Sequence, residues 1–111
     1  MPIYPQTNVV PSTARTASGN SGNLSAPPNC NARFLFSVSA VSGTSPTLQI
    51  LIFSILKSTA ESYIIATASL TAVVSGSLVV ENLPTTYRIN WTIGGTTPSF
   101  TFEVDVQFQD Q

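Results

Sequence analysis

The sequence predicts an all-β protein, an antiparallel β-sandwich of seven or eight short strands, jelly-roll-like or immunoglobulin-like, with an extended N-terminal arm. Apolar and polar residues alternate in several stretches, most cleanly over residues 100–109, as in strands with one buried face. Small and turn-forming residues separate these stretches at intervals of about 10 residues. A Gly-Thr-x-Pro stretch between two apolar runs occurs twice, at residues 43–46 and 95–98.

Each copy of Gly-Thr-x-Pro predicts the turn of one β-hairpin. Glycine can adopt a positive φ, and proline fixes φ near about −65°, so both residue types favour a change of chain direction. Backward from the two copies, the alternation of apolar residues falls out of step, and Ser39 takes the place of Trp91. We therefore expect a β-bulge or a slipped residue in one of the two hairpins.

Residues 1–30 are rich in Pro, Ser, Asn and Gly and cannot build a core of their own. They predict an extended arm with short strands around residues 12–17 and 23–26 and a turn at 18–22. The alternative is that these residues form a flexible terminus without fixed structure. Residues 31–111 form the sandwich, and the whole chain is one domain.

The middle strand of the sandwich is unusually apolar. Its second half carries Leu51, Phe53 and Ile55 on the face opposite Ile50 and Ile52. Such a strand is either buried on both faces or pressed against another subunit. The predicted strands cover residues 34–41, 48–56, 63–70, 72–74, 78–81, 87–93 and 100–109, the sixth anchored in the core by Trp91.

Composition excludes several classes of function. The chain of 111 residues has a net charge of −1 and no basic stripe, so nucleic acid is not an expected partner. It contains no His, which excludes Ser-His-Asp and Cys-His catalysis and the usual metal clusters, and we expect no cofactor. Only 8% of the residues are charged, and a nearly neutral surface of this kind favours assembly.

The sequence also predicts that the protein is neither secreted through a signal peptide nor inserted in a membrane. The first residues lack a basic region followed by an apolar one. The apolar run at residues 48–56 is much shorter than the roughly 20 residues that span a bilayer. We therefore expect synthesis in a cytoplasm. Cys30 has no partner for an intramolecular disulfide and is expected to be an inert, packed thiol.

One pair of carboxylates merits comparison with an active site. Glu103 and Asp105 share one face of the last strand, about 6 to 7 Å apart, which is compatible with glycosidase chemistry or with calcium binding. That face lacks the aromatic platforms of a sugar cleft, so we interpret both side chains as solvated residues that protect the sheet from strand addition. We expect no enzymatic activity.

Residues 13–20, 41–48 and 87–102 together resemble small all-β virion proteins of tailed bacteriophages, some of which resemble capsid decoration or cement proteins. The resemblance implies a non-enzymatic structural protein on the capsid surface of the virion, made in the host cytoplasm. Its implied partners are the major capsid protein and further copies of itself, in a homodimer or homotrimer. The chain departs from the family at residues 53–63, where a charged, Gly-rich turn with Trp is expected.

This departure makes the middle strand apolar, and it predicts a contact between subunits at Leu51, Phe53 and Ile55. The arm is expected to link neighbouring subunits by strand pairing and burial of apolar side chains. The alternative function is a tail or baseplate component that binds a host glycan or another tail protein. The predicted interface comprises Ile3, Tyr4, Val9, Val10, Arg15, Leu51, Phe53 and Ile55.

Overall fold

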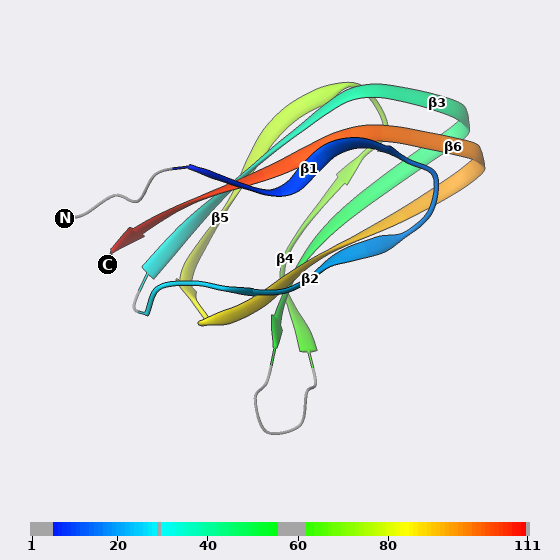
Figure 1. The fold of residues 1–111 in the computed structure, drawn as a ribbon. Helices are drawn as coiled ribbons and strands as arrows, with labels where there is room; N and C mark the ends of the chain where they lie inside the picture. The colour runs from blue at the N-terminus through cyan, green and yellow to red at the C-terminus, as the bar shows by residue number, and fades with distance from the viewer. Residues whose placement is uncertain (1–5, 29, 56–61, 111) are drawn as a thin grey trace.

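The computed structural model describes residues 6–28, 30–55 and 62–110, and in this part of the chain every regular element is a β-strand (Figure 1). All strand pairs are antiparallel, which confirms the predicted all-β, antiparallel class. The strand order is β1-β6-β3-β4, with β2 also on β6 and β5 also on β3. The six strands are β1 (Thr7–Arg15), β2 (Gly19–Ser25), β3 (Cys30–Ile55), β4 (Ser62–Leu70), β5 (Val74–Leu83) and β6 (Thr86–Asp110).

The two longest strands, β3 and β6, replace the two predicted hairpins. Each runs straight through its Gly-Thr-x-Pro stretch, and each pairs with the other strand from Cys30↔Asp110 to Ser54↔Tyr87. The prediction that each copy closes its own hairpin is therefore wrong. The described strands number six because β3, β5 and β6 each take the place of two predicted strands, while β1 and β2 come from the predicted arm.

The Gly-Thr-x-Pro stretches are bends instead of turns. Gly43 and Gly95 have φ values of 110° and 112°, and the positive φ continues at Ser45 and Thr97, at 48° and 45°. These conformations are costly for residues other than glycine, so they mark a forced change of direction. Figure 1 shows β3 and β6 bending back side by side at the same end of the molecule, each with two arms.

The register of the strands shows an internal two-fold arrangement that relates β1–β3 to β4–β6. The axis passes through the pair Thr44↔Thr96, which are equivalent residues of the two Gly-Thr-x-Pro copies. The outer strands β1 and β2 pair with β6, whereas β4 and β5 pair with β3. Each half of the chain therefore supplies the edge strands of the other half, and the two halves stabilise each other.

The expected bulge lies in β3. Val38 pairs with Phe102 and Ala40 pairs with Thr101, so Ser39 is an extra residue with no partner of its own in the register. This confirms the expected bulge and explains why β3 and β6 fall out of step before their bends.

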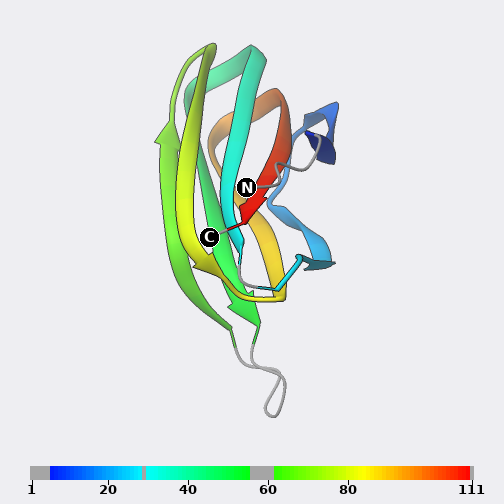
Figure 2. The same ribbon diagram turned by 90° about the vertical axis from the view of Figure 1, so that its left-hand side faces the viewer.

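A single core joins both arms of the long strands. Val10 of β1, Phe34 and Ile52 of β3, and Ile89 and Val104 of β6 are all at most 1% exposed and belong to one packed cluster. Because residues before and after each bend share this cluster, the two arms face each other across it. Figure 2 shows this arrangement from the open end of the molecule, away from the bends.

The N-terminal region contributes two strands to this sheet. β1 and β2 lie within the predicted arm, and both pair with β6 of the same chain. The predicted turn at residues 18–22 overlaps β2, which begins at Gly19 and has a register shift between Asn20 and Asn23. Val10 anchors β1 in the core, and the division into an arm and a sandwich at residue 30 stays a prediction.

β5 is also longer than its sequence suggests. The predicted break at residues 75–77 lies inside the strand, and Gly76 pairs with Phe36 of β3. A Cβ atom at Gly76 would come within 2.8 Å of the Phe36 ring, so glycine is required here for packing and does not end the strand.

Candidate functional site

Arg15 lies at the end of β1, against aromatic rings of β6. Its guanidinium carbon is 4.9 Å from the ring centre of Trp91 and 4.7 Å from that of Phe102. The same group donates hydrogen bonds to the carbonyl oxygens of Pro11, Thr13 and Phe102, at 2.8, 3.1 and 3.0 Å. Burial lowers the pKa of Arg15. The side chain is thus committed to holding β1 on β6, which is a structural role.

The apolar strip of β3, defined as Leu51, Phe53 and Ile55, lies on the face of the sheet opposite the core. Leu51 is 8% exposed and is absent from the core cluster, and Phe53 and Ile55 are half-buried. A strand that is apolar on both faces is therefore confirmed in this half of β3. Because neighbouring side chains already cover Leu51, the surface available to a partner is made mainly by Phe53 and Ile55.

The two-fold arrangement shows that this strip is a local feature of one half. A shift of 52 residues places Leu51, Phe53 and Ile55 at Glu103, Asp105 and Gln107 of β6. Equivalent strands of the same fold thus carry apolar side chains on one outer face and acidic or amide side chains on the other. The fold itself therefore does not require the apolar strip.

Two polar atoms beside the strip have no hydrogen-bond partner. They are Arg88 Nε and Asn90 Oδ1, and both are buried. Arg88 pairs with Phe53 and Asn90 pairs with Leu51 in the register of β3 and β6. Buried polar groups are nearly always hydrogen-bonded, so these two atoms are exceptions in the layer beside the strip.

The acidic face of β6 is closed by its own neighbours. Asp105 accepts hydrogen bonds from the side-chain amides of Gln6 and Asn8, at 2.6 and 2.7 Å. Asp105 therefore helps to bind the start of β1 to β6. In the described part of the chain, no group of three or more His, Cys, Asp or Glu side chains could hold a metal ion.

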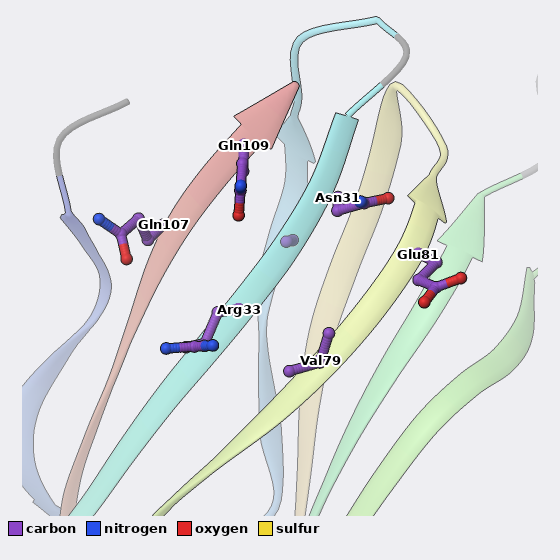
Figure 3. A pocket seen from close by; sticks show the side chains of 7 residues that line it. Asn31, Arg33, Val79, Glu81, Gln107 and Gln109 are labelled. Atoms are coloured by element: carbon purple, nitrogen blue, oxygen red, sulfur yellow. The ribbon is translucent and has the colours of Figure 1, made fainter. Parts of the chain in front are cut away.

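A shallow hollow of about 260 Å³ lies on the outer face formed by β3, β5 and β6. Figure 3 shows side chains of all three strands at its surface, among them Arg33, Val79 and Gln107. Amide and charged groups can donate and accept hydrogen bonds to a polar ligand. No local pattern in the sequence indicates this hollow, because residues distant in the chain form it. Its lining residues are Asn31, Ala32, Arg33, Val79, Glu81, Gln107 and Gln109.

The structure divides the predicted interface residues among different environments. Val10 is 1% exposed in the core and leaves no surface for a partner, and Val9 is half-buried against the core. Arg15 is held by β6 on the other side of the sheet from β4, so it is not brought together with the apolar strip. Ile3 and Tyr4 lie outside the described residues.

Two further side chains, those of Cys30 and Tyr87, are buried in the core. Cys30 is fully buried, as expected of a packed thiol. Tyr87 is 1% exposed and packs edge-on against Phe34 and Phe108. Burial, and to a smaller extent the nearby Cys30, raise the pKa of Tyr87 to about 12.

No family model, no curated protein and no solved structure matches the chain. Across the described ranges, no helix has the length and apolar character needed to cross a membrane.

Proposed function

We propose that this protein is a non-enzymatic structural protein of a tailed-phage virion, a decoration or cement protein that stabilises contacts between major capsid subunits. The virion context rests on the resemblance of residues 13–20, 41–48 and 87–102. The observation that carries the contact is the apolar strip of β3, whose equivalent positions on β6 are polar. The nearly uncharged surface, with 8% charged residues, suits a protein that works in an assembly.

We interpret the fold as a β-sandwich whose two layers are the arms of β3 and β6 on either side of their bends. One shared core between the arms supports this interpretation. Each layer then has four strand segments, with β1 of the predicted arm in one layer and β2 in the other. The layer that contains β2 and β4 carries the apolar strip on its outer face, and this face would lie on the capsid.

A binding assay with matched variants tests the proposal. The purified protein is mixed with capsids of the encoding phage assembled without it, and bound protein is measured by co-sedimentation. Phe53→Ser with Ile55→Ser removes the exposed part of the strip, and we expect at least a tenfold loss of binding, because two aromatic or branched side chains leave the contact. The control, Glu103→Ser with Gln107→Ser, changes equivalent positions of the other half and should bind as the wild type does. Equal binding of both variants would contradict the assignment of this face.

The alternative, a tail or baseplate component that binds a host glycan or another tail protein, is favoured by one observation. The hollow around Arg33 and Gln107 offers amide, guanidinium and carboxylate groups beside the apolar Val79. Titration with host polysaccharide separates the two functions. Saturable binding that Arg33→Ala abolishes, with no binding to capsids, would favour the tail component.

A further inference from the structure

β4 is an unprotected edge of the sheet. It pairs with β3 on one side, and it is the last strand in the order β1-β6-β3-β4. Figure 2 shows β4, in green, along the left margin of the molecule, with no strand beyond it. An edge strand of nine residues presents backbone N–H and C=O groups that can pair with another strand.

β4 and most of β5 lack the residue types that protect an exposed edge. Residues 62–80, which contain β4 and most of β5, include no Asp, Glu, Lys, Arg or Pro. Natural proteins protect exposed edges with charged residues, especially Lys, or with Pro. The two-fold equivalent side, β1 and β2, has this protection in Pro11 and Arg15. The contrast arises within one fold, so the architecture alone does not explain it.

Exposed apolar side chains concentrate on the same side. Among the described residues, the large hydrophobic side chains that are exposed are Ile64, Val73, Val74 and Val79, at 52%, 63%, 40% and 62%. All four lie in β4, in β5 or in the connection between them. Ile64 also pairs in register with Phe53, so the β4 edge is continuous with the apolar strip.

From these observations we propose that a second copy of this chain binds at the β4 edge, with the two β4 strands antiparallel across a two-fold axis. An uncharged edge suits self-pairing, because each residue meets residues of the same strand and a charge would meet its own copy. The dimer would join the two sheets and place both apolar strips next to one another. The inference rests on the proposed function, since the same resemblance implies further copies of the chain as partners, and it assigns this contact to the β4 edge because Leu51 is already covered.

Paired lysine substitutions test this dimer. Thr67→Lys with Ser69→Lys places two charges on exposed positions of β4. The control is Ser12→Lys with Ala14→Lys on β1, the two-fold equivalent of β4. Ala14 pairs with Thr101 of β6 in the same way as Ser69 pairs with Gln49 of β3. Sedimentation velocity should give twice the mass of the 11.7 kDa chain for the wild type and the β1 variant, and a single chain for the β4 variant.

Amide hydrogen exchange of the wild-type protein provides a test that needs no variant. Amides of residues 62–70 should exchange at least tenfold more slowly at concentrations where the dimer forms, while amides of β1 stay unchanged. The proposal is overturned if the wild type is monomeric or trimeric, if the β4 variant stays dimeric, or if both variants lose the dimer. It is also overturned if amide exchange in β4 does not depend on protein concentration. Capsid binding of the wild type is measured separately. A wild type that is monomeric and still binds capsids refutes the β4 dimer alone. A wild type that forms the β4 dimer but does not bind capsids refutes the proposed function alone.

Discussion

Replacing either bend glycine by alanine should destabilise the protein strongly and by the same amount. A Cβ atom at Gly43 would lie 2.7 Å from the Thr97 carbonyl oxygen, and one at Gly95 would lie 2.7 Å from the Ser45 carbonyl oxygen. Both contacts are with backbone atoms, which cannot rotate away as a side chain can. Both positions also have φ near 110°, where alanine is strained by about 1 to 3 kcal/mol.

Strain and overlap together should lower the free energy of unfolding by about 3 kcal/mol for Gly43→Ala and equally for Gly95→Ala. Gly22→Ala is the matched control, because Gly22 has a φ of 77° but no atom within 4 Å of the added Cβ. Without the overlap, its cost should be about 1 kcal/mol. Chemical denaturation followed by Trp91 fluorescence measures all three values.

At about 4 °C per kcal/mol, each bend variant should lose about 12 °C in melting temperature. The double variant should not show the sum of the two losses, because each added methyl group contacts the other bend and a shift of the backbone relieves both. Either of two results would refute the role of the bend glycines. In one, a bend variant is no less stable than Gly22→Ala; in the other, the free energies of unfolding of the two bend variants differ by more than about 1.5 kcal/mol, half of the cost expected for each.

Two further substitutions test contacts inside the fold. Arg15→Ala should lower the free energy of unfolding, measured by urea denaturation, by about 2 to 3 kcal/mol, because two ring contacts and three hydrogen bonds are lost. Arg15→Lys should recover less than half of this loss, and full recovery would show that only the charge matters. The raised pKa of Tyr87 means that the folded protein keeps its phenol proton up to about pH 12, whereas the unfolded chain loses its proton near pH 10. The contribution of the protonated Tyr87 phenol to the free energy of unfolding is therefore complete below pH 10, and about 1 to 2 kcal/mol of it is lost as the pH rises towards 12. Tyr87→Phe should show less of this loss of stability at alkaline pH.

Local patterns in the sequence predicted most strands but not the pairing of the longest ones. The strand predicted at residues 63–70 matches β4, because alternation and β-branched residues act locally. A positive φ at Gly43 is equally compatible with a tight turn and with a bend in a continuous strand. The choice depends on whether the flanking residues pair with each other or with the other copy, 52 residues away, and no local pattern reports that contact.

The candidate surfaces show the same division between local and long-range information. The apolar strip was predictable, since Leu51, Phe53 and Ile55 break the expected alternation within a single strand. The unprotected edge was not, because residues 62–80 become an edge only once β3 takes β6 as its other neighbour. Their lack of charge was visible in the sequence and could have served as a signal, had the edge position been known.

The proposed place on the capsid can be tested by electron cryomicroscopy of particles from the encoding phage, with particles that lack this gene as the comparison. We expect additional density on the capsid, over joints between major capsid subunits, into which two copies fit with Phe53 and Ile55 facing the capsid. Density confined to the tail, or identical capsids with and without the gene, would contradict it.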